Sequence, residues 1–170
     1  MSNSRFFVRT LALSGIIAAI YAGLTLFLPI PQYGGVQLRA AEALTLLPFL
    51  LPEATLGLTV GCLLANLIGS PYVLDWVFGT LATFLAALLT RRMPNKWLAA
   101  IPPVLCNAVI VGAEVAYFSV LDGAAFGPAF AFNALTVGLG ELIACFALGV
   151  PLIRWMQRNP YMREFLAQKR

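Results

Sequence analysis

The chain has 170 residues, of which 61% are hydrophobic and 11% are charged, and its formal net charge is +4. Soluble domains contain about 25% charged residues, so a water-soluble monomer could not cover its surface with so few charges. The composition therefore predicts an integral membrane protein, and a single membrane domain over residues 1–170 suits this length.

Six apolar segments follow one another along the chain, and each is a candidate transmembrane helix. Their approximate bounds are 10–28, 40–51, 54–69, 74–90, 98–120 and 129–155. A helix needs about 20 residues to cross the hydrocarbon, so the second and third segments are short. Pro48 and Pro52 separate these two, because proline removes a helical donor and clashes with the preceding turn. The sequence thus predicts an all-α bundle of six transmembrane helices.

Basic residues indicate how this bundle is oriented. They fall into three clusters: Arg5 and Arg9; Arg91, Arg92 and Lys96; and Arg154, Arg158, Arg163, Lys169 and Arg170. Positive loops stay cytoplasmic, so an even number of crossings must separate the first two clusters, and the split at Pro48 and Pro52 supplies it. We expect both termini in the cytoplasm, a retained first span rather than a cleaved signal, and external connections at 29–38, 70–73 and 121–128.

The C-terminal stretch 156–170 is a basic, amphipathic tail. Such a tail is typical of segments that lie on the cytoplasmic surface of a membrane and contact anionic lipid. We therefore expect the lipid bilayer, and no nucleic acid, as its partner.

Small residues repeat every four positions in two segments. Ser14, Ala18 and Ala22 do so in the first segment, and the third segment repeats Gly57, Gly61, Ala65 and Gly69. This spacing allows close approach of helices in lipid. For the third segment internal packing is favoured, whereas for the first both internal packing and docking onto another membrane protein remain open.

Little in the sequence supports a catalytic role. The chain has no histidine, which removes the commonest general base and metal ligand. Its three cysteines, Cys62, Cys106 and Cys145, lie in apolar segments without CxxC spacing, which argues against a disulfide framework or a zinc site. We expect no catalytic residue and no metal, and an intramembrane enzyme is disfavoured.

Four acidic residues lie within or at the ends of apolar segments. Glu42 and Asp75 are predicted at outer ends, and at 1.5 Å per residue Glu114 lies about 9 Å and Glu141 about 18 Å below the outer ends of their segments. A charged residue at the centre of a membrane helix costs about 2.5–3.5 kcal/mol. The cluster is therefore either a polar knot that fixes helix packing or a pocket open to the outside.

Other polar residues extend this constellation. Asn66 lies near the outer end of its segment, and Asn107 is two helical turns from Glu114 on the same face. Arg39 precedes Glu42 by three residues, a spacing that permits an ion pair on one helical face. A pocket so rich in acceptors suits a small ligand with several N–H donors or a positive charge, such as the amidine-like edge of guanine.

Three runs of sequence together resemble a known family. They are 36–48 (VQLRAAEALTLLP), 57–66 (GLTVGCLLAN) and 75–83 (DWVFGTLAT), and the AxxxA face of Ala18 and Ala22 accompanies them. They are similar to the S components of energy-coupling factor (ECF) transporters, and within them to the QueT-type transporters of queuosine precursors. The resemblance covers most of residues 10–155.

The resemblance implies a substrate-binding subunit that docks, through Ala18 and Ala22, on a transmembrane coupling subunit (EcfT-like) driven by two ATP-binding subunits. ATP would be used by those partners, and no cofactor is implied for this chain, which has no GxxxxGK[ST] motif. The implied ligand is a 7-deazaguanine such as 7-aminomethyl-7-deazaguanine, whose guanine-like edge and aminomethyl cation would suit Glu42, Glu114 and Glu141. From the polar constellation we expect the substrate site to consist of Arg39, Glu42, Asn66, Asp75, Asn107, Glu114 and Glu141. Two alternatives remain open: another vitamin or purine-like ligand, and a stand-alone, proton-coupled secondary transporter.

Overall fold

The computed structural model describes residues 3–167, with side chains from Phe7 onward, and within this range the chain is helical and forms no strand. The predicted all-α class is confirmed. Lys169 and Arg170 of the predicted basic tail lie outside the described residues, as does the side chain of Arg5.

Four helical segments in the described range are long and apolar enough to cross a membrane: Phe7–Phe27, Val73–Thr90, Lys96–Leu121 and Phe126–Arg158. The first belongs to α1 (Asn3–Phe27), and the second comprises η2 (Val73–Trp76) and α3 (Phe78–Thr90). The third runs through α4 (Lys96–Ala99), α5 (Ile101–Cys106), the π-helical η3 (Asn107–Val111) and α6 (Gly112–Leu121). The fourth consists of α7 (Phe126–Leu142), the π-helical η4 (Ile143–Gly149) and α8 (Val150–Arg158), and α9 (Pro160–Ala167) follows it.

Two shorter apolar helices lie between the first and second of these segments. They are η1 (Ala40–Phe49) and α2 (Ala54–Gly69), so the break predicted between them is confirmed. However, η1 is a 3-10 helix, and Pro48 lies inside it instead of ending it. The helix closes one residue later, where the backbone N–H of Leu50 donates to Leu47 O at 2.9 Å.

Glycines set the contact between α1 and α2. A Cβ atom at Gly57 would lie 2.5 Å from Ser14 O, and one at Gly61 would lie 2.8 Å from Ala18 O. The small-residue face of α2 therefore packs inside the bundle, as expected. This contact also corrects a prediction: Ala18 is only 5% exposed, since it lies against Gly61, and is not available for docking.

The outward face of α1 carries other small residues. Gly15 and Ala19 are exposed, and Ala22 is half-buried next to Ala18. A Cβ atom at Gly15 or Gly23 would meet nothing within 4 Å. Close approach of another helix to α1 is thus possible on the side of Gly15, Ala19 and Gly23 rather than at Ala18.

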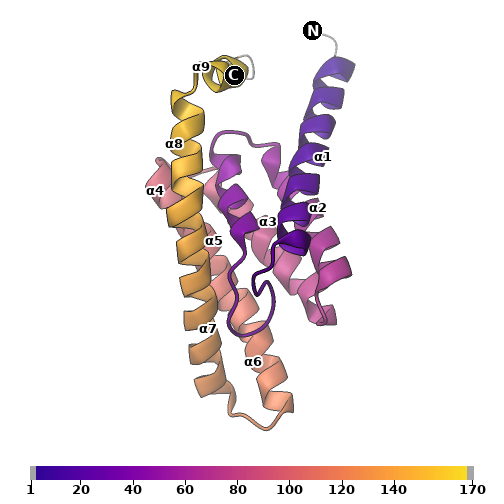
Figure 1. Cartoon of the computed structure of the whole chain (residues 1–170), viewed down its shortest axis with the longest axis vertical. Helices are drawn as coiled ribbons and strands as arrows, with labels where there is room; N and C mark the ends of the chain where they lie inside the picture. The colour runs from indigo at the N-terminus through magenta and orange to yellow at the C-terminus, as the bar shows by residue number, and fades with distance from the viewer. Residues whose placement is uncertain (1–2, 168–170) are drawn as a thin grey trace.

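One large apolar cluster joins α1, η1, α2 and α8. Its fully buried members include Leu46, Leu58 and Ile153. The start of α1 and the end of α9 lie at the same end of the molecule, and the segment between α1 and η1 runs as a long loop beside α7 (Figure 1). This loop carries three buried polar side chains, Gln32, Gln37 and Arg39.

Candidate functional site

The loop 28–39 is fixed against the bundle by hydrogen bonds at several points. Leu38 N donates to Pro31 O at 2.8 Å, which closes the loop on itself. Gly34 has φ +97°, a conformation that favours glycine, and permits the tight turn there. The Thr136 hydroxyl of α7 donates to Gly35 O, so the turn is held on α7.

Tyr33 anchors the same loop to α2. Its hydroxyl donates to Ala65 O at 2.9 Å, and burial raises the pKa of this phenol, which keeps the donor proton in place. The Tyr33 ring also lies under Arg39, whose guanidinium carbon is 4.8 Å from the ring centroid. This is a cation–π contact at short range.

Arg39 lies at the entrance of η1 and is buried. Its Nε donates to Gln32 O at 2.7 Å, whereas its Nη2 has no hydrogen-bond partner in the described part of the chain. Arg39 has an extended backbone (φ −101°, ψ 101°) before the first residue of η1. The predicted ion pair with Glu42 on one helical face is therefore wrong: Arg39 is not in the helix, and its bonds go to the loop.

Glu42 is fully buried and takes a partner from α1 instead. The Tyr21 hydroxyl donates to Glu42 Oε1, while Oε2 has no partner among the described residues. Sequence reasoning missed Tyr21. The signal was a phenol in the middle of an apolar helix, since a buried tyrosine hydroxyl usually finds a hydrogen-bond partner.

Glu141 of α7 interacts electrostatically with Glu42. The Cys145 thiol lies between them, 3.7 Å from Glu42 O and 3.9 Å from Glu141 Oε2. Gly140 lets the loop approach α7 closely, because a Cβ atom there would lie 2.1 Å from Gln37 O of the loop. The structure thus brings η1, α7 and the loop together at one point.

Asp75 and Asn66 form a second polar group, where α2 meets η2. Asn66 Nδ2 donates to Asp75 O at 2.8 Å, and the Ser70 hydroxyl donates to Asp75 Oδ2. Gly79 allows the contact, because a Cβ atom there would lie 2.9 Å from Asn66 Nδ2. Asn66 Oδ1 has no partner in the described range, so one face of this amide stays free.

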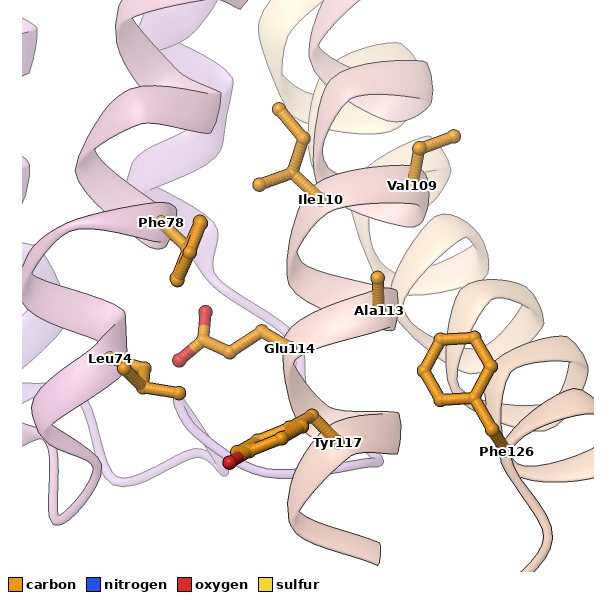
Figure 2. Close-up of a pocket in the computed structure, with 8 residues that line it drawn as sticks. All are labelled: Leu74, Phe78, Val109, Ile110, Ala113, Glu114, Tyr117 and Phe126. Carbon is orange, nitrogen blue, oxygen red and sulfur yellow. The ribbon is translucent and has the colours of Figure 1, made fainter. Parts of the chain in front are cut away.

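Glu114 on α6 is buried and its carboxyl group lies within hydrogen-bonding range of that of Asp75, but neither of its oxygens accepts from a donor among the described residues. It borders a groove of about 660 Å³ between η2, α3, η3, α6 and α7, with otherwise largely apolar walls. Figure 2 shows the carboxylate pointing from α6 towards Leu74 and Phe78, with Tyr117 next to it. Both oxygens can therefore accept from a molecule that enters this region.

Electrostatics connect the two polar groups. Glu114 interacts with Asp75, and Arg39 interacts with Glu42, Asp75, Glu114 and Glu141. We call this set the polar centre; its members are Arg39, Glu42, Asn66, Asp75, Glu114 and Glu141. The polar centre thus combines one guanidinium with four carboxyl groups, a composition that suits a cationic or donor-rich ligand.

The unpaired polar atoms around this centre are both donors and acceptors. Within the described residues, buried donors without a partner include Arg39 Nη2, Trp76 Nε1 and Gln32 Nε2. Buried acceptors without a partner include Gln32 Oε1, Gln37 Oε1, Glu42 Oε2, Asn66 Oδ1 and both oxygens of Glu114. Leaving such groups unpaired costs about 1–3 kcal/mol each, a cost that a ligand with matching donors and acceptors would offset.

Asn107 behaves differently from the other predicted residues. It is buried, but its Nδ2 donates to Pro103 O of its own helical segment at 3.1 Å. It also begins η3, whose π-helical turns change the angle between Asn107 and Glu114 from the one assumed for an α-helix. Its role in binding a ligand stays a prediction.

Among the described residues, no group of three or more His, Cys, Asp or Glu side chains is arranged to hold a metal ion. Cys62, Cys106 and Cys145 are all free. Cys62 accepts from the Thr83 hydroxyl at 3.3 Å at the contact between α2 and α3, which makes it a packing residue.

The comparison with known protein families agrees with a membrane bundle that has a buried polar centre. A family model described as QueT transporter matches residues 11–158. The chain belongs to the QueT transporter family. It is accordingly a multi-pass membrane transport protein with a small-molecule substrate. No curated protein and no solved structure matches the chain significantly.

Membership of the QueT transporter family confirms the resemblance that the three sequence runs indicated. The match extends from α1 into the last residue of α8, so it includes every member of the polar centre.

Proposed function

We propose that this chain is the substrate-binding S component of an ATP-driven ECF importer and that it takes up a queuosine precursor of the 7-deazaguanine type. The observation that carries the proposal is the polar centre, in which Glu42, Asn66, Arg39 and Glu114 keep buried polar atoms without partners. A ligand that supplies those partners gains directional hydrogen bonds in a site shielded from water.

The chemistry of 7-aminomethyl-7-deazaguanine suits this site. Its N1–H and exocyclic amine present two parallel donors, which match the carboxyl group of Glu114, whose oxygens accept from no donor among the described residues. Its aminomethyl cation suits the region of Glu42 and Glu141, two buried carboxyl groups that interact electrostatically. Its carbonyl can accept from Arg39 Nη2 or Trp76 Nε1, two buried donors without a partner among the described residues.

For the topology we propose six crossings with both termini in the cytoplasm. Four segments are long enough to cross a membrane. The two shorter helices would make the other crossings: α2 is about 24 Å long at 1.5 Å per residue, and η1 is about 20 Å long at 2 Å per residue. Two supports exist: the start of α1 and the end of α9 lie at one end of the molecule (Figure 1), and α4 packs on α8, which carries Arg154 and Arg158.

Docking on a transmembrane coupling subunit is proposed for the outward face of α1. Because Ala18 is buried, the face consists of Gly15, Ala19 and Gly23, with Ala22 at its edge. Ala19→Leu should weaken co-purification with the coupling subunit and leave ligand affinity unchanged. Ile16→Ala, a change at another exposed position of α1, provides the control.

Transport in liposomes tests the proposal. Uptake of labelled 7-aminomethyl-7-deazaguanine is measured with this chain alone and with the coupling subunit, both ATP-binding subunits and ATP. We expect uptake only in the complete, ATP-supplied system. Uptake by the chain alone, driven by a proton gradient, would contradict an S component and favour a secondary transporter.

Another vitamin or purine-like compound is the second candidate ligand. The unpaired donors and acceptors of the polar centre are compatible with a vitamin as well as with a purine-like compound. A thermal-shift screen of vitamins, purines and 7-deazaguanines against the purified chain distinguishes them, and we expect the largest stabilisation with the 7-deazaguanines.

A further inference from the structure

Gln32 lies in the loop 28–39 and is only 6% exposed, yet neither atom of its side-chain amide has a hydrogen-bond partner among the described residues. Gln37 of the same loop is similarly buried, but only its Oε1 is recorded as buried and unpaired. Buried amides are almost always hydrogen-bonded. A molecule outside the chain is the natural partner for both the donor and the acceptor of Gln32.

The loop holds Gln32 at the polar centre. Gln32 O accepts from Arg39 Nε at 2.7 Å, and Arg39 interacts electrostatically with Glu114. The loop also lies against α6, since a Cβ atom at Gly35 would be 3.9 Å from Val115 Cγ1, one residue from Glu114. The loop that carries Gln32 therefore packs on α6, the helix that carries Glu114.

We propose that Gln32 binds the edge of the ligand that carries N3 and N9–H, and that it thereby selects the free base over its nucleoside. This inference rests on the proposed function. If Glu114 accepts from N1–H and the exocyclic amine, the remaining edge with an acceptor beside a donor is N3 with N9–H. A glutamine amide pairs with such an edge through two reciprocal hydrogen bonds, with its NH₂ donating to N3 and its oxygen accepting from N9–H.

The same pairing explains how a nucleoside is rejected. In a nucleoside N9 carries the ribose, so the donor is lost and the Gln32 oxygen is left buried without a partner. A site built to hydrogen-bond a donor discriminates strongly against an analogue that lacks it. Gln32 is therefore a specificity-determining residue at the ligand, in addition to the carboxyl groups.

Isothermal titration calorimetry on the purified chain tests the pairing with two ligands. One is 7-aminomethyl-7-deazaguanine, and the other is an isosteric analogue in which oxygen replaces N9–H. We expect the wild type to bind the analogue about 10-fold more weakly or worse. Gln32→Leu should bind the base roughly 10- to 100-fold more weakly and should lose the difference between the two ligands.

Gln157→Leu serves as the matched control, because Gln157 is exposed on α8 and the chemical change is the same; both affinities should equal those of the wild type. Circular dichroism and thermal melting check that Gln32→Leu folds. If it does not, Gln32→Met replaces it, since methionine has a similar length and shape but loses both the amide donor and the strong oxygen acceptor.

Two results would overturn the inference and leave the proposed function intact: equal affinity of the wild type for both ligands, or an unchanged difference between them in a folded Gln32 variant. Failure of the wild type to bind either ligand would instead contradict the proposed function itself. A nucleoside bound by the wild type as tightly as the base would also overturn the selection assigned to Gln32.

Discussion

The apolar cluster and the polar centre share the helices η1 and α2, yet they differ in how completely their polar and apolar groups find partners. In the apolar cluster Leu46, Leu58 and Ile153 are fully buried among other apolar side chains. In the polar centre Glu42 and Glu114 are equally well buried but keep oxygens without partners. The helix η1 contributes to both regions, with Leu46 in one and Glu42 in the other.

This difference separates stability from function. Apolar packing lowers the free energy of the folded state, whereas buried polar atoms without partners raise it. The polar centre therefore persists at a cost to stability, which a bound ligand offsets. Substitutions in the apolar cluster should reduce stability with little effect on ligand affinity, and substitutions in the polar centre should do the reverse.

The largest effect is expected where helices approach most closely. Gly61→Leu places a side chain where a Cβ atom would already lie 2.8 Å from Ala18 O, and overpacking of this kind costs about 3 kcal/mol or more. We expect loss of the folded, monodisperse protein in size-exclusion chromatography. Gly15→Leu is the control, because a Cβ atom at Gly15 meets nothing within 4 Å; equal loss there would contradict the packing of α1 on α2.

Glu114→Gln probes the polar centre. It replaces one accepting oxygen by a donor, and two charge-assisted hydrogen bonds to the ligand are together worth about 3 kcal/mol, or more than 100-fold in affinity. Thermal stability without ligand should be unchanged or higher, because a buried unpaired carboxylate is removed. Calorimetry and thermal melting measure both quantities, with exposed Glu164→Gln as the control.

Tyr21→Phe tests a residue that touches both regions. Tyr21 belongs to the apolar cluster and its hydroxyl donates to Glu42 Oε1. We expect ligand affinity to fall about 10-fold, since a hydrogen bond to a charged group is worth roughly 1.5 kcal/mol, while the ring keeps the packing. Unchanged affinity would show that Glu42 is oriented without this phenol.

Ile153→Val is the mildest change and completes the comparison. Removing one methylene from this fully buried side chain should lower stability by about 1 kcal/mol. Ligand affinity should stay within a factor of two of the wild type, as measured by calorimetry. A larger loss of affinity than of stability would mean that the two regions are not separable.

Much of the fold followed from the pattern of apolar residues. The six apolar segments predicted from sequence correspond to helical stretches in the structure, and the break between η1 and α2 lies where Pro52 predicted it. Periodicity could not show that η1 is a 3-10 helix, because ten residues including a proline suit several helical geometries. It also could not reveal which side of α1 faces α2, since small residues occur on both sides of that helix.

The candidate site was predicted in part. Glu42, Glu114 and Glu141 were predicted because they are acidic residues in apolar segments, and burial of a carboxylate in a membrane is costly unless it has a function. Gln32 was missed, since an uncharged residue in a turn-rich stretch carries no such signal. Its burial depends on how the loop folds over the bundle, a long-range contact that a local pattern does not contain.

Calorimetric titration of the purified wild-type chain with 7-aminomethyl-7-deazaguanine and with its 6-amino analogue, which lacks N1–H, tests the central claim most directly. The account predicts saturable binding of the first ligand at one site per chain, and binding of the second that is weaker by at least about 10-fold. Absence of binding, or equal affinity for both compounds, would contradict a polar centre that recognises the donor edge of a 7-deazaguanine.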